Sequence, residues 1–290
     1  MGIADSSDGS DTDAVRAEIL ERWGRAAAGW SRRAQQVREF GLPVSAWMLD
    51  HAGLQPGLRV LELAAGPGET GFLASELIRP GGSLICSDAT DEMLEVARAR
   101  AKELGIENVE FKRIELEWID LETASVDVVL CKWGLMFSTD PEASLREMRR
   151  VLRPGGRVAL AVWDEPPENP WATIPTETMV ELGHTTPPDP GAPGMFALAP
   201  PGRLQDVLEA AGFLDVRIGS VEPSRAFDSV EDYIAETRDL SSVFGELLDP
   251  LSDEQRTEVV ARVTELAQPY VDADGMLRLP ARSLVAAADA

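Results

Sequence analysis

Short apolar segments alternate with helix-patterned segments through the middle of the chain, and this alternation constrains the fold more than any other feature. The apolar segments are short and are bounded by glycine and proline, which is typical of buried strands. Because strands separated by helices form right-handed crossovers, we predict an α/β fold: a doubly wound, Rossmann-like sheet of seven mostly parallel strands. The expected strands are 58–64, 83–88, 108–114, 126–133, 157–163, 213–221 and one within 276–288.

The segments outside this alternation differ from one another in composition. Apolar residues at helical spacing precede the first strand and predict one or two helices ending near Pro43. About half of the prolines lie in 164–201, which predicts a long irregular segment, and long irregular segments in compact domains tend to be functional. No clean domain boundary is visible. The expected parts are a disordered acidic tail (1–12) and a single domain (13–290) with an N-terminal helical cap (13–50), a cofactor-binding core (58–163), a substrate-side insert (164–201) and a helical insert (229–271).

The charge of the chain restricts its partners. It has 50 acidic against 27 basic side chains, a formal net charge of −23. Such a field repels phosphate backbones and anionic membrane surfaces, so we expect no nucleic-acid partner and no membrane insertion. We recognise no signal peptide and expect a cytoplasmic protein. Cys86 and Cys131 lie within apolar runs and are expected in the core, and no cysteine and histidine spacing predicts a metal site.

A glycine-rich loop follows the first expected strand and opens a helix. Its Gly66-x-Gly68-x-x-Gly71 spacing fits a dinucleotide site, and Asp88 ends the next strand, where it could accept hydrogen bonds from ribose hydroxyls. Glu62, however, lies four residues before Gly66 and would repel a pyrophosphate.

Two further features also disfavour a phosphate at this loop. Pro67 has no N–H to donate. Glu115 and Glu117 follow the third strand and add negative charge near the same edge, although we expect Glu117 to be solvated. S-adenosylmethionine fits these features, because it carries an adenine, a ribose, a sulfonium and an ammonium and has no phosphate.

The sequence resembles class I S-adenosylmethionine-dependent methyltransferases of the ubiquinone/menaquinone-biosynthesis type. The blocks that carry the resemblance are 62–68, 87–101 and 126–163, in the order and spacing of that family. Ala64 replaces the first glycine of the loop, and Glu115-Leu116 replaces an Asp-Ala pair. The resemblance implies that Glu62, Ala64, Ala65, Gly66 and Gly68 hold the methionine end, that Asp88 binds the ribose, that Ala89, Met93, Glu115 and Leu116 surround the adenine, and that Cys131 faces the transfer site.

The methyl acceptor is expected to be a small, largely apolar molecule, methylated on O, N or C. His184 in the proline-rich insert is the candidate general base or substrate contact. A homodimer is left open, and so are two alternative functions: a non-catalytic binder of S-adenosylmethionine and a nicotinamide-dependent oxidoreductase. The expected substrate pocket consists of Trp23, Trp30, Trp133, Met136, Phe137, Trp171 and Phe196.

Overall fold

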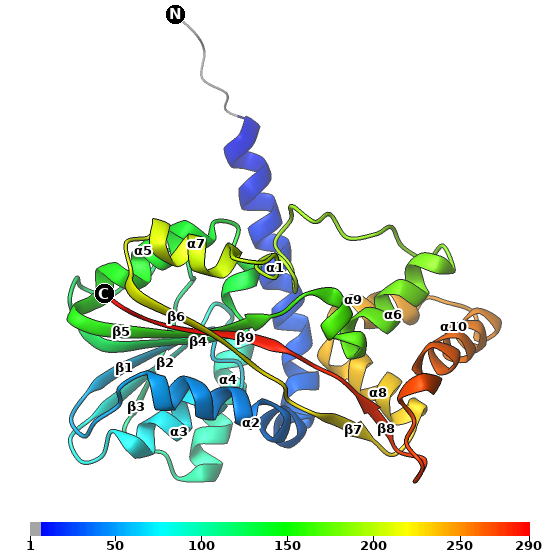
Figure 1. The fold of residues 1–290 in the computed structure, drawn as a ribbon, viewed down its shortest axis with the longest axis horizontal. Coiled ribbons are helices and arrows are strands. Elements are labelled where there is room, and N and C mark those ends of the chain that lie inside the picture. Colours follow the sequence, from blue (N-terminus) through cyan, green and yellow to red (C-terminus); the bar gives the residue numbers. More distant parts are fainter. Residues whose placement is uncertain (1–6) are drawn as a thin grey trace, which may run out of the picture.

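The computed structural model describes residues 7–290, and its centre is the predicted α/β sheet (Figure 1). Seven strands lie in the order β3-β2-β1-β4-β5-β9-β6, and β9 runs antiparallel to both of its neighbours. The doubly wound, mostly parallel fold predicted from the alternation is therefore confirmed. The strands are β1 (Arg59–Leu63), β2 (Ser83–Asp88), β3 (Val109–Arg113), β4 (Val126–Lys132), β5 (Leu152–Trp163), β6 (Leu214–Val221) and β9 (Ser283–Asp289).

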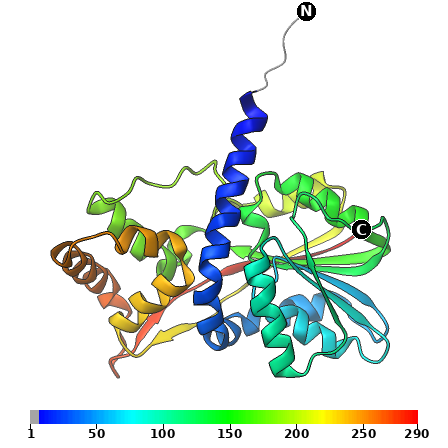
Figure 2. The same cartoon turned by 180° about the vertical axis from the view of Figure 1, so that it is seen from behind.

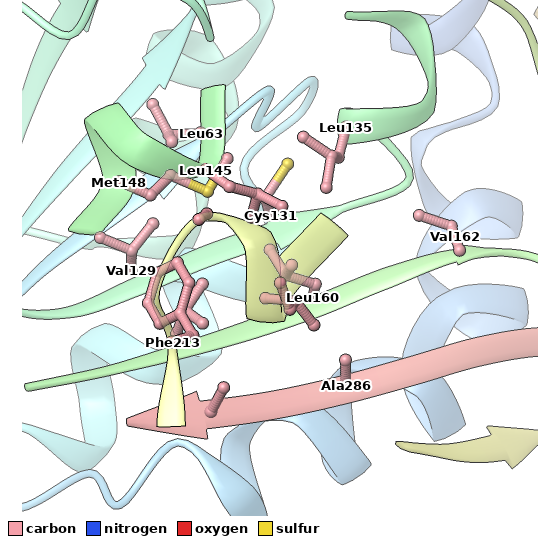
Figure 3. Close-up of a cluster of buried hydrophobic side chains, with 14 of the residues drawn as sticks. Leu63, Val129, Cys131, Leu135, Leu145, Met148, Leu160, Val162, Phe213 and Ala286 are labelled. Atoms are coloured by element: carbon pink, nitrogen blue, oxygen red, sulfur yellow. The ribbon is translucent and has the colours of Figure 1, made fainter. Parts of the chain in front are cut away.

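Helices cover both faces of the sheet. Successive side chains of a strand point to opposite faces, so Leu61 and Leu63 of β1 join one buried cluster and Val60 joins another. Figure 3 shows part of the first cluster, in which Cys131 of β4 lies near side chains of neighbouring strands and helices. One face carries α2 (Ala34–His51), α3 (Glu69–Leu77) and α4 (Asp91–Leu104), and the other carries η1 (Leu135–Phe137), α5 (Pro141–Val151) and α7 (Arg203–Ala210).

The two inserts predicted from the sequence fold together into what we call the helical lobe (Figure 1). Ile174 from the first insert and Tyr233 and Val263 from the second share one buried cluster. The buried Arg225 guanidinium lies 4.6 Å from the Phe40 ring of α2 and joins this lobe to the sheet side. The lobe consists of η2 (Pro166–Glu168), α6 (Pro170–Glu181), β7 (Arg225–Phe227), α8 (Val230–Leu240), α9 (Ser242–Leu248), α10 (Asp253–Ala267), η3 (Gln268–Tyr270) and β8 (Leu277–Leu279).

A single long helix, α1 (Ser7–Arg32), runs between the helical lobe and the sheet (Figure 2). It packs against α4 on one side and against α8 and α9 on the other. Its first turns project beyond both the helical lobe and the part of the molecule that contains the sheet (Figure 1). Within the described residues, no helix combines the length and the apolar character needed to cross a membrane.

The structure corrects several predictions about the flanking segments. Of the tail predicted for 1–12, residues 1–6 lie outside the described part, and the chain is helical from Ser7. The second helix does not end near Pro43 but continues to His51, because its buried face, including Val44 and Met48, packs on the sheet. Sequence periodicity could not show that packing.

The substrate-side insert is less irregular than predicted. It contains α6, which begins at Pro170, where a missing N–H removes no helical hydrogen bond. The segment predicted to hold one last strand holds two, because Pro280 separates them. Of these, β8 pairs with β7 in a separate sheet, and only β9 joins the main one.

Candidate functional site

A cavity of about 130 Å³ lies at the carboxyl ends of the central parallel strands, beneath α1. This is the edge at which doubly wound sheets bind ligands. The lower wall, which we call the floor, comes from residues 62–70, 88–93, 114–117 and 132–138, and the upper wall, which we call the cover, comes from α1. The glycine loop, the end of β2 and the acids after β3 therefore meet in one place, as the sequence predicted.

The loop after β1 folds tightly because several of its residues adopt left-handed backbone conformations. Gly66 has a φ of 53° and Gly68, which precedes the first turn of α3, a φ of 85°. Ala64 also has a positive φ, 49°, at the position where the resembling family has glycine. Its methyl group fits because the facing residue is Gly134, where any Cβ would overlap that of Ala64.

Asp88 connects the loop to the end of β2. Its Oδ2 accepts a hydrogen bond from the N–H of Gly66 at 2.9 Å, and its Oδ1 accepts one from the N–H of Thr90 at 3.2 Å. Burial raises the pKa of the carboxyl, and the hydrogen bonds from Gly66 and Thr90 oppose that shift. The side chain that caps α4 is Thr90 and not Asp88, so the carboxyl group of Asp88 is not used as a helix cap.

Glu62 is buried beneath the loop. Its Oε1 accepts a hydrogen bond from the N–H of Gly71 at 2.8 Å, whereas its Oε2 is buried with no partner among the residues that the structure describes. Burial raises the pKa of Glu62 to about 8, with the backbone hydrogen bond from Gly71 opposing. A buried oxygen without a partner, at the wall of a cavity, is the arrangement expected where a ligand supplies the donor. Glu62 thus fits the ammonium of an S-adenosylmethionine tail.

Of the two acids after β3, Glu115 lies where it was predicted and Glu117 does not. Glu115 and Leu116 line the cavity, as expected for the adenine edge. Glu117 is not simply solvated, because its Oε1 accepts hydrogen bonds from the N–H of Thr139 and the hydroxyl of Ser138, both at 2.8 Å. Glu117 therefore fixes the segment after β4 against the segment after β3, a contact between two segments that the sequence did not indicate.

Aromatic rings form the contact between the cover and the floor. Trp23 of α1 lies edge-to-face with Phe137, with the ring centroids 5.1 Å apart, and also with Trp30 at 5.8 Å. Trp30 is held from the other side, because its Nε1 donates to the carbonyl oxygen of Leu240 in the helical lobe at 3.0 Å. The three rings line the cavity, so they lie where the sequence analysis expected a closing element.

Trp133 lines the cavity at the end of β4 in a strained backbone conformation. Its φ is 60°, which is rare for a bulky residue. The indole Nε1 donates to the hydroxyl of Ser283 at 2.9 Å, and the backbone N–H donates to the carbonyl of Ala161 at 2.7 Å. Such strain persists where the surroundings hold it and is common at functional sites.

Other candidates do not line the cavity. Cys131 and Met136 are buried in the core on the face of the sheet that carries α5 and α7. Trp171 packs edge-to-face on Trp163, with centroids 5.0 Å apart. Phe196 packs against the same core, and His184 follows α6 with its backbone N–H bonded to the Met179 carbonyl. The roles that we assigned to Cys131, Met136, Trp171, Phe196 and His184 stay predictions.

Among the cavity-lining residues that the sequence analysis did not select is Lys132, the last residue of β4. Its side chain points to the opposite face from Cys131, because adjacent strand residues alternate. The signal was present in the sequence as a charged residue at the end of the apolar run VVLC. A lysine at the carboxyl end of a buried strand indicates a partner or a ligand for its ammonium group, because a buried charge is costly unless it is paired.

Comparisons with known proteins agree with this geometry. Residues 54–184 match the family model described as "Methyltransferase domain". The ubiquinone/menaquinone biosynthesis C-methyltransferase UbiE of Pasteurella multocida is 35% identical over 127 residues, covering 43% of this chain and 47% of that protein. The same enzyme from Shewanella baltica strain OS155 is 32% identical over 121 residues, covering 41% and 48%. The chain thus matches about half the length of these curated relatives.

Solved structures share the fold at low identity. The YcgJ protein from Bacillus subtilis superimposes with a TM-score of 0.56 and 20% identity, covering 84% of this chain and 97% of that one. The [4+2]-cyclase SpnF superimposes with a TM-score of 0.52 and 16% identity, covering 84% and 80%.

The fold and the site agree on a class: residues 54–184 match a methyltransferase domain, and the chain folds around a Rossmann-like sheet. The predicted resemblance to class I S-adenosylmethionine-dependent methyltransferases of the UbiE-like type is confirmed, and S-adenosylmethionine is the cofactor of that class.

Proposed function

We propose that the chain is an enzyme that transfers a methyl group from S-adenosylmethionine to a small, largely apolar molecule. The observation that carries the proposal is the combination of charges at one cavity. An unpartnered Glu62 oxygen, the Asp88 carboxylate and Glu115 line the floor, and aromatic rings line the cover. This set suits a nucleoside that carries cations and an aromatic base. It does not suit a pyrophosphate, so the nicotinamide-dependent alternative is not favoured.

The chain's own residues would act mainly by positioning. S-adenosylmethionine, when bound, supplies an electrophilic methyl group on a sulfonium. Glu62 and the loop backbone from Ala64 to Gly68 would hold its methionine end, and Asp88 would accept hydrogen bonds from its ribose hydroxyls. Trp23, Trp30 and Phe137 would exclude water, which favours alignment of donor and acceptor over hydrolysis.

The remaining proposals concern the surroundings of the enzyme. We propose a cytoplasmic bacterial protein, supported by the bacterial relatives. A net charge of −23 supports the proposal that nucleic acid is not a partner.

Calorimetric titration with S-adenosylmethionine, S-adenosylhomocysteine and NADH tests the proposal. We expect micromolar binding of the first two and none of NADH. Asp88→Ala should weaken binding by about 100-fold or more, because hydrogen bonds to a charged group contribute about 1.5–3 kcal/mol each. Asp91→Ala, which removes a largely exposed carboxylate three residues further on, is the matched control and should bind normally. Binding of NADH in place of S-adenosylhomocysteine would overturn the proposal.

A second candidate is a protein that binds the cofactor without transferring its methyl group. It is supported by the fold likeness to a [4+2]-cyclase and by the lack of a histidine among the residues lining the cavity. Incubation with a panel of small phenols, enols and amines separates the two candidates. Release of S-adenosylhomocysteine supports the enzyme, and tight cofactor binding with no release on any acceptor supports the alternative.

A further inference from the structure

The placement of Lys132 beside Glu62 follows from the register of the sheet. Glu62 of β1 pairs with Leu130 of β4, and Leu130 points to the same face as Lys132 because residues two apart on a strand share a face. Leu130 and Val60 both belong to the buried cluster that packs under α2 and α3. Glu62 and Lys132 therefore lie on the same face of adjacent strands, and both line the cavity.

The ammonium group of Lys132 is held in place by its surroundings. Its Nζ donates to the hydroxyl of Ser45 at 3.1 Å, and Ser45 is in turn hydrogen-bonded to Thr70 at 2.8 Å. The Nζ also lies 4.9 Å from the centre of the Trp133 ring. Gly41 of α2 leaves room for it, because a Cβ there would come within 2.7 Å of the Nζ. These contacts hold a cation at a defined point of the wall.

This cation has unused donors. An ammonium has three N–H groups, and the described part of the chain shows one hydrogen bond from it and no carboxylate within ion-pair distance. Desolvation lowers the pKa of Lys132 to about 8, with Glu62 and Glu69 opposing. A buried cation with free donors at a cavity wall is suited to an anionic ligand group.

The nearby acid Glu69 is already neutralised. Its Oε1 accepts a hydrogen bond from the Nε of Arg100 at 2.8 Å, and its Oε2 lies 3.6 Å from a guanidinium nitrogen of Arg38. At this end of the cavity, the Oε2 of Glu62 and the ammonium of Lys132 thus remain without an ion-pair contact among the described residues. The Glu62 oxygen can accept a hydrogen bond from an ammonium, and the Lys132 ammonium can donate one to a carboxylate. Together they are complementary to a ligand group that carries both.

We propose that Lys132 binds the carboxylate of the cofactor's methionine tail while Glu62 binds its ammonium, so that the cavity selects a nucleoside with a zwitterionic tail. This inference rests on the proposed function. It assigns Lys132 a role in cofactor selection, in addition to the residues that the family resemblance implied. It also requires Gly41, whose lack of a side chain leaves space for the ammonium.

Decarboxylated S-adenosylmethionine is the discriminating probe, because it keeps the adenosine, the sulfonium and the amine and lacks only the carboxylate. Calorimetric titration of the wild-type chain should give binding about 10- to 100-fold weaker for this analogue than for S-adenosylmethionine, the range for a hydrogen-bonded charged group. Lys132→Met should bind the two ligands within about threefold of each other, with its affinity for the analogue near that of the wild type.

Two further variants complete the test. Lys102→Met removes an exposed lysine from α4 and should keep the full preference of the wild type. Gly41→Ala keeps Lys132 but displaces its ammonium, and should lose most of the preference. Circular dichroism shows whether Lys132→Met folds. If it does not, Gly41→Ala provides the test in its place.

The outcomes separate the inference from the proposed function. A preference for S-adenosylmethionine that is unchanged in both Lys132→Met and Gly41→Ala overturns the role of Lys132 alone. A wild-type protein that binds neither ligand overturns the proposed function. A preference that is lost in both variants and kept in Lys102→Met supports the inference.

Discussion

The floor and the cover of the cavity are built in different ways. In the floor, hydrogen bonds join the loop after β1 to the adjacent strand ends, and they span 9 residues from Glu62 to Gly71 and 22 residues from Gly66 to Asp88. The cover depends on contacts between remote segments, because Trp30 of α1 donates to the carbonyl of Leu240. A motif can therefore define the floor, whereas the cover exists only after the helical lobe has folded. Changes in the cover should alter access to the cavity and leave the sheet intact.

The largest effect is expected where the cover meets the helical lobe. A Cβ at Gly29 would overlap the backbone carbonyl of Asp239 in α8, and a backbone group cannot move aside as a side chain can. Gly29→Ala should therefore separate α1 from α8, lower the free energy of unfolding by about 1–3 kcal/mol and weaken cofactor binding by about 10-fold or more. Urea unfolding and calorimetric titration measure the two effects.

Gly24→Ala in the same helix is the matched control. A Cβ there would meet the side chain of Glu92 at 3.3 Å, and this flexible carboxylate can move. Alanine is a better helix former than glycine by about 1 kcal/mol, so this variant should be as stable as the wild type or more so. Equal behaviour of the two variants would show that the cover is not closed by its contact with α8.

The accuracy of the sequence predictions follows the same division. The seven-stranded sheet and the floor residues Glu62, Asp88 and Glu115 could be predicted, because strand periodicity and a local loop determine where they lie. The helix α6 was missed because its prolines suggested irregular structure, although Pro170 occupies a first-turn position that tolerates proline.

Lys132 and Glu117 show what the sequence could not provide. The position of the Lys132 ammonium depends on Gly41 and Ser45 of α2, and Ser45 lies 87 residues earlier in the chain. The role of Glu117 depends on Ser138 and Thr139. In both cases the local sequence shows a charged residue, and only packing between elements shows what it contacts.

A smaller effect, confined to the floor, is expected from the buried carboxyl of Glu62. Its pKa is raised from 4.5 to about 8 in the folded chain, so between these values the folded protein keeps a proton that the unfolded chain releases. The contribution of protonated Glu62 to the free energy of unfolding is fully present below pH 4.5 and is lost as the pH rises toward 8. The slope is at most about 1.4 kcal/mol per pH unit for one proton. The pKa of Lys132 is lowered to about 8 in the folded chain, so this lysine makes the free energy of unfolding rise with pH, but only above pH 8.

Glu62→Gln should remove this pH dependence. A neutral amide cannot release a proton, so the wild-type chain should lose about 1–2 kcal/mol relative to the variant as the pH rises from about 5.5 to 7.5. Urea unfolding of both proteins without ligand at the two pH values measures the difference. Parallel pH profiles would show that Glu62 is ionised in the folded chain, and that the floor holds its carboxylate without a cofactor.

The smallest effect is expected at the left-handed loop residue Ala64. A non-glycine residue in this region costs about 1–2 kcal/mol, and glycine costs about 0.5–1 kcal/mol in chain entropy, so Ala64→Gly should stabilise the chain by up to about 1 kcal/mol. Ala65→Gly, at the next position and without a positive φ, should instead destabilise it by about 0.5–1 kcal/mol. Urea unfolding compares the two. If both variants lose stability equally, then packing of the Ala64 methyl against Gly134 outweighs the backbone strain, and the floor depends on contacts between remote segments as the cover does.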